Sequence, residues 1–396
     1  MQRTVAIAGG GFVGRSLAIA LKTQSHLDVV LYAGGPMPSD KRSSTISASA
    51  RRMLSRIGAW PMMAEAAQPV YGLHITDSAS EDVVRPEVLN FEGEHGANAF
   101  AHLVPNHVMH AALVDRCAQL GIAEDSRKVV FFEDHHGHIT AELSDGSKEV
   151  ADVLVAADGR QSVLRRIAGI PTVEKDFHQS VITGTVSHSE PHNGYATQHF
   201  LPNGAMAMLP LVGDQSSLAW SERPSFAKAL GDMDAELASL EIERVFGLRL
   251  GRLCVEGGLQ VYPLKGLLAR RWVDGRLVLA GDAAHVIHPL AGQGLNLGFR
   301  DVAALAEVLT EADRHGEDLA LALPRYERWR RADTTQMAFV TDGLNTLFSR
   351  RSDLVRSIRS IGLGLVNRDE DLKALFIREA AGVEGDVPHL MRGEAV

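Results

Sequence analysis

The stretch LVLAGDAAHVIHPLAGQGLNLGFR, residues 277–300, decides the fold of this chain. Its first four residues are apolar and predict a buried strand, and the loop that follows carries Gly281, Asp282 and Pro289. Apolar residues then recur at helical spacing from the Gly292 region onward, which predicts a helix. A strand, a loop of small residues and a helix N-terminus together direct backbone N–H groups at an electron-rich ligand.

A second glycine-rich loop lies near the start of the chain. The apolar run at residues 4–8 predicts a strand, and Gly9, Gly11 and Gly14 follow it in GxGxxG spacing, ahead of a helical pattern. Gly9 permits a tight turn, Gly11 lets the backbone approach a pyrophosphate, and Gly14 lets the helix pack closely on the strand. The pattern predicts a βαβ unit that binds a dinucleotide; a glycine-rich turn without a ligand is the alternative.

The second strand of this unit, residues 28–32, lacks an expected acidic residue at its end. Ala33 occupies the place where a carboxylate usually holds the adenosine ribose. Asp40, in the loop that follows, is the candidate substitute. The sequence therefore predicts either another way of holding the ribose or weaker binding of the dinucleotide.

A third loop follows the apolar run at residues 153–157. Asp158 and Gly159 lie at the carboxyl end of this predicted strand, where open α/β sheets bind ligands, and Ser162 and Arg165 follow on a helix. The pattern favours a second contact loop at the dinucleotide. A strand-to-helix turn that Asp158 merely caps is the alternative.

Arginine and histidine side chains give weaker signals. Arg42 precedes a predicted helix and is a candidate contact for a phosphate, although a solvated arginine fits its spacing equally well. His285 and His288 have HxxH spacing without a third ligand nearby, so a loop-packing role is favoured over metal binding, with proton handling as a further alternative. A predicted turn carries three more histidines without carboxylate or thiol partners, and we expect no metal there either: His135, His136 and His138.

The middle of the chain predicts a different kind of domain. Short alternating patterns between residues 180 and 261 are typical of a mostly antiparallel sheet. Four of its large side chains suit either a flat apolar ligand or a sheet–helix core: Phe200, Met206, Met208 and Trp220. The predicted division is a dinucleotide-binding domain (1–70, 101–175 and 265–325), an inserted substrate-binding sheet domain (71–100 and 176–264) and a C-terminal helical region (326–396). The fold class is thus α/β (α+β), with a Rossmann-like domain.

Composition limits the partners that the protein can have. The net charge of -9 without a basic arm argues against nucleic acid, and two cysteines without CxxC spacing predict a reducing compartment. The first predicted strand begins at about Thr4, so we expect no signal peptide and a cytoplasmic protein. Peripheral contact with the inner face of a membrane, or with a protein complex, is the alternative role for the basic C-terminal helices. Their arginines are Arg325, Arg328, Arg330, Arg331, Arg350, Arg351, Arg356 and Arg359.

With these three loops, the chain resembles the class A flavoprotein monooxygenases, which share the para-hydroxybenzoate hydroxylase fold. More narrowly, it is similar to the ubiquinone-biosynthesis hydroxylases, and the resemblance spans essentially the whole chain. The passages that carry it are RSSTISASARRMLSRIGAW (42–60), QHFLPNGAMAMLPL (198–211), YPLKG (262–266) with the opening stretch, and RYERWRRADTTQMAFVTDGLNTLFSR (325–350).

The resemblance implies FAD as the cofactor, with NADPH or NADH as a transient reductant. It implies that Pro289 lies beside the reactive flavin carbon, and we name Pro289 and His288 as candidate catalytic residues. Family members usually have Glu at Ala33 and often Arg at His107, and both departures remove contacts near FAD. The predicted cofactor-binding residues are Gly9, Gly11, Gly14, Arg42, Asn106, Asp158, Gly159, Gly281, Asp282, Gly292, Gln293, Gly294 and Asn296.

The activity that the resemblance implies is hydroxylation of a polyprenylated phenol in ubiquinone biosynthesis, through a flavin C4a-hydroperoxide. Because water destroys that adduct, the site has to be dry, which the apolar residues after Asp282 could provide. Two alternatives stay open: hydroxylation of a soluble aromatic compound, and a weak-flavin, lipid-binding or scaffolding subunit of a quinone-biosynthesis complex.

Overall fold

The protein contains a six-stranded, mostly parallel sheet in the order β18-β19-β12-β1-β2-β8. We describe a computed structural model, which covers residues 3–35, 40–77, 87–92, 99–289, 292–348, 382 and 385–396. Only the edge strand β18 is antiparallel to its neighbour. The strands are β1 (Thr4–Ala8), β2 (Asp28–Tyr32), β8 (Ala123–Asp125), β12 (Val153–Ala156), β18 (Val273–Asp274) and β19 (Leu277–Leu279).

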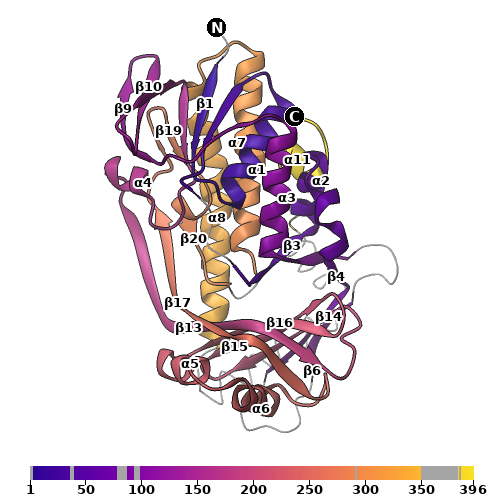
Figure 1. The fold of residues 1–396 in the computed structure, drawn as a ribbon. Helices are drawn as coiled ribbons and strands as arrows, with labels where there is room; N and C mark the ends of the chain where they lie inside the picture. The colour runs from indigo at the N-terminus through magenta and orange to yellow at the C-terminus, as the bar shows by residue number, and fades with distance from the viewer. Residues whose placement is uncertain are drawn as a thin grey trace.

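Helices cover this sheet and complete a Rossmann-like layer structure (Figure 1). β1 pairs in parallel with both β2 and β12, and β12 pairs in parallel with β19. The carboxyl ends of β1, β12 and β19 therefore lie side by side. The helices of this part of the molecule are α1 (Phe12–Gln24), α2 (Ala48–Arg56), α3 (Asn106–Gln119), α4 (Val163–Ile167), α7 (Gly294–Arg314), α8 (Leu319–Phe348) and α11 (His389–Arg392), with the short 3-10 helices η1 (Trp60–Met62), η2 (Ala64–Ala66) and η3 (Gly281–Ala283).

Two small antiparallel sheets flank the six-stranded sheet. One has the order β3-β7-β4 and the other β11-β10-β9. Their strands are β3 (Ser43–Ser47), β4 (Gln68–Val70), β7 (Ala101–Pro105), β9 (Val129–His135), β10 (His138–Leu143) and β11 (Lys148–Ala151).

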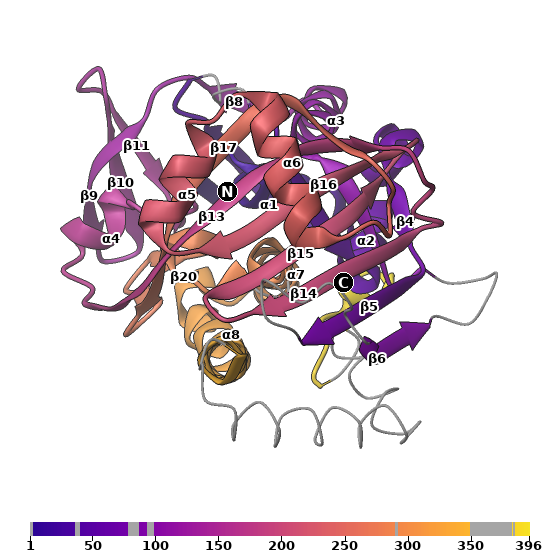
Figure 2. The same ribbon diagram turned by 90° about the horizontal axis from the view of Figure 1, so that it is seen from below.

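An eight-stranded sheet forms the second half of the molecule, in the order β20-β17-β13-β16-β15-β14-β5-β6. Only the β14–β5 pair in it is parallel. Seen from below, α5 (Pro224–Gly231) and α6 (Ala235–Phe246) lie across the face that points away from the six-stranded sheet (Figures 1 and 2). The strands are β5 (Gly72–Asp77), β6 (Glu87–Glu92), β13 (Thr172–His188), β14 (Tyr195–Leu201), β15 (Gly204–Leu211), β16 (Gln215–Glu222), β17 (Leu253–Ala269) and β20 (His285–Val286).

These sheets confirm the predicted fold class, a Rossmann-like α/β domain joined to a mostly antiparallel sheet. The residue boundaries given for the domains stay predictions. The long strands β13 and β17 run between the two halves, so the chain crosses from one to the other within single strands (Figure 1).

Two large hydrophobic cores are found within the part of the chain that the structure describes. The first lies around the six-stranded sheet and contains Val5, Leu17 and Phe299 together with the distant Leu390 and Met391. The second lies between the eight-stranded sheet and the helices α5 and α6, and all its buried residues fall between Ile182 and Val255. Burial of such apolar side chains is the main favourable term in folding, so each half has its own source of stability.

The core interpretation is confirmed for three of the four large side chains predicted to suit a flat ligand. Met206, Met208 and Trp220 belong to the second core, under α5 and α6. Phe200 is buried, but side chains alternate along β14, so it points away from the core residue Leu201 that follows it.

Half of the arginines on which the prediction of basic C-terminal helices rests fall in residues 349–381, a segment outside the described residues: Arg350, Arg351, Arg356 and Arg359. Of the arginines that are described, Arg330 is buried and paired, whereas Arg325 and Arg331 are about half exposed and pair with Glu311 and Glu327. Among the residues that the structure covers, no helix combines the length and the apolarity needed to cross a membrane.

Candidate cofactor and substrate site

Three predicted loops meet at one edge of the six-stranded sheet. They follow β1, β12 and β19, which are adjacent in the sheet. The loops approach so closely that a Cβ on Gly9 would lie 2.2 Å from the Ala157 carbonyl oxygen. Likewise, a Cβ on Gly281 would lie 2.9 Å from the Val13 side chain. Glycine is therefore required sterically at both positions, and the sequence-predicted loops form one site.

The first loop leaves room where a pyrophosphate is expected. Gly9 has φ +120°, and a Cβ on Gly14 would lie 1.9 Å from the Gly9 carbonyl oxygen, so both are needed for the turn. Around Gly11, by contrast, no heavy atom of the described residues comes within 4 Å of the place a Cβ would take. Gly11 is also the N-cap residue of α1 and has no side chain to cap the first N–H groups. These features fit a bound dinucleotide.

Asp282 lies in the third loop. It is exposed to solvent, although protein atoms surround its carboxylate closely enough to perturb its ionisation. Burial raises the pKa of Asp282, and the nearby charges of His285, Arg42 and Arg160 oppose this rise. An accessible carboxylate of this kind is suited to accept hydrogen bonds from a polyhydroxylated chain.

Arg42 and Asn106 are linked through Asp40. Two guanidinium nitrogens of Arg42 donate to the Asp40 carboxylate at 2.8 Å, and the Asn106 amide donates to it at 2.7 Å. Burial opposes ionisation, yet these hydrogen bonds lower the pKa of Asp40 to about 2. The Arg42 guanidinium also lies 5.1 Å from the centre of the Tyr262 ring. Asp40 therefore serves as an anchor for Arg42, and its carboxylate is already used by two side chains.

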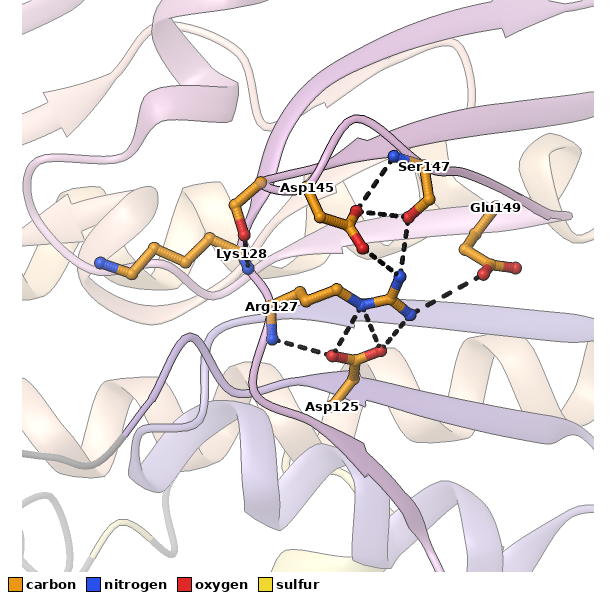
Figure 3. Close-up of polar contacts among 7 residues, drawn as sticks. Asp125, Arg127, Lys128, Asp145, Ser147 and Glu149 are labelled. Carbon is orange, nitrogen blue, oxygen red and sulfur yellow. Dashed lines mark hydrogen bonds and ion pairs between the residues drawn. The ribbon is translucent and has the colours of Figure 1, made fainter.

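The end of β2 is surrounded by a different polar cluster, which Figure 3 shows. The Ala33 N–H donates to the Asp125 carbonyl at 2.7 Å, and the Asp125 carboxylate is held by Arg127. Arg127 also binds Asp145 and the Ser147 hydroxyl (Figure 3). Asp125, on the strand beside Ala33, is thus part of a structural cluster that joins β8 to the β10–β11 turn.

Asp158 caps the helix that follows it, as the alternative interpretation of its loop predicts. Its carboxylate accepts from the Val163 N–H at 2.8 Å and more weakly, at 3.4 Å, from the next N–H. Arg165 then connects two of the loops, because its guanidinium donates to the Ala283 carbonyl at 2.7 Å and to the Arg160 carbonyl at 2.9 Å. Contact of Asp158 and Gly159 with a cofactor stays a prediction.

The N-terminus of α7 is shaped by Asn296. Its Oδ1 accepts from the Ser47 N–H at 2.9 Å, and its Nδ2 donates to the carbonyls of Thr45 and Gly292 at 2.9 and 3.2 Å. The amide is therefore used in tying β3 to the turn before α7. Gln293 is the N-cap residue, and the first N–H groups of α7 begin beyond it at Gly294.

Asp301 is the centre of a buried ionic network that the sequence analysis missed. Its carboxylate accepts from the Gly281 N–H at 2.9 Å, from His285 Nε2 at 2.6 Å and from Arg330 Nε at 2.8 Å. Although burial opposes the charge, His285 and Arg330 hold the pKa of Asp301 below its usual value. The network joins the Asp282 loop to α7 and α8. The only sign of this network in the sequence was Asp301 itself, an acid on an otherwise apolar face of α7.

His288 is buried beside the same loop, whereas Pro289 is exposed. His288 Nε2 lies 3.2 Å from the Gln179 side-chain oxygen, and the Phe177 ring packs edge-on against the imidazole at 4.7 Å. Burial lowers the pKa of His288 to about 4, so the imidazole is neutral at pH 7. The side chain packs as a loop histidine, and the catalytic roles of His288 and Pro289 stay predictions.

Two alanines lie on the face of the eight-stranded sheet that is turned toward the three loops. Because Met206, Met208 and Trp220 point toward α5 and α6, the alternating neighbours Ala207 and Ala219 point the opposite way, toward the six-stranded sheet (Figure 1). Ala207 and Ala219 are paired across β15 and β16.

Comparisons with known proteins show the family to which the chain belongs. The family model described as "FAD binding domain" matches residues 2–339. The chain is 38% identical to the ubiquinone hydroxylase UbiL of Rhodospirillum rubrum, covering 98% of this chain and 92% of that one. It is 31% identical to the 3-demethoxyubiquinol 3-hydroxylase of Escherichia coli, over 96% and 98% of the two chains. Among solved structures, p-nitrophenol 4-monooxygenase from Pseudomonas putida shares the fold, with a TM-score of 0.80, 19% identity and coverage of 97% and 98%.

Proposed function

The chain belongs to the class A FAD-dependent monooxygenases and, within them, to the ubiquinone-biosynthesis hydroxylases, and we propose that it hydroxylates the aromatic ring of a polyprenylated phenol in that pathway. It is a flavoprotein monooxygenase with FAD as its cofactor. The observation that carries the proposed substrate is the pair of small side chains Ala207 and Ala219, on the sheet face turned toward the three cofactor loops.

The chain's own residues divide the work of holding FAD. We assign the pyrophosphate to the N–H groups after Gly11, because that helix N-terminus faces open space. We assign the ribityl chain to Asp282, with Arg42 held ready by Asp40. The N-terminus of α7, beyond Gln293, would stabilise negative charge on the reduced ring. Bound FAD supplies the oxygen chemistry that the resemblance predicts, reduction by NADH or NADPH followed by activation of O₂ at flavin C4a.

The protein's second task is to keep water and protons away from the reacting oxygen. His288 suits this task because its imidazole is buried, packed on Phe177 and neutral at pH 7. Ala283 and Ala284 in the same loop are also buried and apolar. A dry site strengthens the electrostatic interactions within it and limits loss of the activated oxygen to water.

The proposal is tested by reconstituting the protein with FAD, reducing it with NADPH or NADH without oxygen, and then admitting O₂ with a prenylphenol. We expect a hydroxylated prenylphenol, with at least ten times less product from the same phenol without its prenyl chain. If reduced holoprotein yields only hydrogen peroxide with every prenylphenol, the proposed substrate class is wrong. Equal rates with prenylated and unprenylated phenols would instead indicate a soluble aromatic substrate.

Peripheral membrane contact and a cytoplasmic location remain part of the proposal. A prenylphenol partitions into lipid, so an enzyme that acts on one has to receive it from a membrane surface or a partner protein. Co-sedimentation with vesicles, with and without anionic lipid, tests the membrane route.

A further inference from the structure

A β-bulge in β13 aims two side chains at the loop that carries His288. Asp176 pairs with Lys265 and Ser180 pairs with Pro263, so residues 177–179 stand opposite a single residue of β17. At the centre of the bulge, His178 has φ +55°, a conformation that non-glycine residues seldom adopt. Bulges of this kind re-aim side chains and are frequent beside active sites.

The bulge brings Gln179 into a buried position between three parts of the molecule. Its side-chain oxygen lies 3.2 Å from His288 Nε2 and 3.3 Å from Asn345 Nδ2, and its side-chain nitrogen donates to the Asn203 carbonyl at 2.5 Å. His288 belongs to the loop after β20, Asn203 to the β14–β15 turn of the eight-stranded sheet, and Asn345 to α8. One amide thus joins the cofactor half, the substrate sheet and the long C-terminal helix.

The pattern of donors fixes the orientation of the amide and the tautomer of His288. The Asn203 carbonyl can only accept, so the nitrogen of the Gln179 side chain faces it. The Gln179 oxygen then faces His288 and can only accept as well. The neutral imidazole of His288 therefore carries its proton on Nε2.

We propose that Gln179 is a positioning residue for hydroxylation, which sets the tautomer and orientation of His288 and thereby holds the His288–Pro289 loop against the flavin ring. The inference rests on the proposed function for its link to hydroxylation. Because Gln179 also holds the Asn203 turn and α8, the loop keeps its place only while the substrate sheet and α8 are docked. A further tie between the same two parts is the ion pair of Lys175, on β13, with Asp342 of α8.

A purely structural glutamine would contribute stability alone, and the test uses measurements that do not depend on the fraction folded. Gln179→Leu removes all three hydrogen bonds in a side chain of similar size. Gln179→Glu keeps an acceptor for His288 but loses the donor to the Asn203 carbonyl. Gln215→Leu is the matched control, since Gln215 is an exposed glutamine on the same sheet.

The first readout is ¹⁵N NMR of FAD-loaded enzyme labelled at its histidines. The His288 signals are assigned as those missing from the spectrum of the single variant His288→Gln. The native spectrum should show protonated Nε2 and unprotonated Nδ1 for His288. Gln179→Leu should shift the His288 signals toward a mixture of tautomers, and Gln179→Glu should keep Nε2 protonated and raise the pKa of His288. Gln215→Leu should leave these signals unchanged.

The second readout is the fraction of consumed NADPH that yields hydroxylated product, together with the visible spectrum of bound FAD. In Gln179→Leu this fraction should fall at least threefold, with peroxide taking its place, and the flavin bands should shift; Gln179→Glu should recover part of the loss. Unchanged His288 signals in Gln179→Leu would overturn the proposal, and so would altered signals with an unchanged flavin spectrum and product fraction. If the native enzyme hydroxylates no prenylphenol, the proposed function fails, while NMR and the flavin spectrum still decide the role of Gln179.

Discussion

At the scale of single residues, we expect Ala33 to affect how the adenosine end of FAD is held. Ala33 lies against the first glycine loop, since a Cβ on Gly10 would come within 2.7 Å of the Ala33 Cβ. The two nearby acids are already committed, Asp40 to Arg42 and Asn106, and Asp125 to Arg127. We therefore expect the ribose to be held without the acidic anchor that is usual after the second strand of such a domain.

Replacing Ala33 by Glu should tighten FAD binding. A carboxylate beside the glycine loop could accept hydrogen bonds from the ribose hydroxyls, which is worth about 1–3 kcal/mol. The measurement is the dissociation constant of FAD and apoprotein, from quenching of flavin fluorescence. Ala33→Leu is the control, because it adds a side chain without an acceptor and should not tighten binding. An unchanged constant in Ala33→Glu would mean that another group already holds the ribose.

Two buried histidines should make the free energy of unfolding fall in mild acid. Burial lowers the pKa of both His102 and His288 from 6.5 to about 4, and the positive charge of Arg51 adds to the effect at His102. Between pH 6.5 and 4 the unfolded chain binds these protons and the native protein does not, so stability is lost as the pH falls. Each histidine contributes roughly 3 kcal/mol over that range. Urea unfolding at pH 7 and pH 5 measures the loss.

The variant His102→Gln isolates one of these contributions. It removes a titrating group that packs edge-on against the Trp60 ring. The drop in unfolding free energy between pH 7 and pH 5 should be smaller in this variant than in the native protein. The same drop in both proteins would show that the pKa of His102 is not lowered in the native state.

At the scale of elements, the alternation along β15 separates substrate binding from core packing. Ala207 faces the cofactor half and Met206 belongs to the second core. Ala207→Phe should raise the KM for the prenylphenol at least tenfold, because the added ring fills the space left by small side chains. Met206→Leu, the matched control on the other face, should cost less than about 1.5 kcal/mol of stability and leave KM unchanged. A KM effect in Met206→Leu of the same size would place the substrate elsewhere.

The link between α7 and α8 depends on a buried ion pair. Asp301 and Arg330 are both about fully buried, so Asp301→Asn leaves a buried guanidinium with much less compensation. We expect a loss of about 3–5 kcal/mol in the free energy of unfolding. Asp333→Asn should lower the free energy of unfolding by less, because Asp333 is 30% exposed and solvent screens its ion pairs with Arg330 and Arg300. Equal losses, measured by urea unfolding, would contradict the central role of Asp301.

Sequence reasoning succeeded where a feature is local and failed where it depends on distant partners. The glycines after β1 and β19 were predicted because a tight turn needs glycine wherever it occurs. Asp301, Gln179 and Asp40 form hydrogen bonds with residues from distant segments of the chain, and such pairs cannot be predicted from periodicity. The alternation of Met206, Ala207 and Met208 was visible in the sequence, but which face would meet the helices was settled only by the packing of α5 and α6.

At the scale of the whole molecule, FAD should stabilise one half of the protein more than the other. The three cofactor loops all leave the six-stranded sheet, so bound FAD contacts the half that contains the first core. At 100 times its dissociation constant, FAD should add about 2.7 kcal/mol to the free energy of unfolding. Hydrogen exchange should slow in β1, α1 and α7 and change little in α6. Equal protection of α6 would show that the two halves open as one unit.

The makeup of the two cores also sets an order of assembly during synthesis. Among the described residues, the buried members of the second core lie within 182–255, so these parts are available once that stretch has left the ribosome. The first core joins Val5 and Leu17 to Leu390 and Met391, and it is incomplete until the segment around Met391 has been made. The half that contains the first core is thus synthesised first but completes its packing last. Until then its apolar surface has to be covered, either by partial packing of the half itself or by a chaperone.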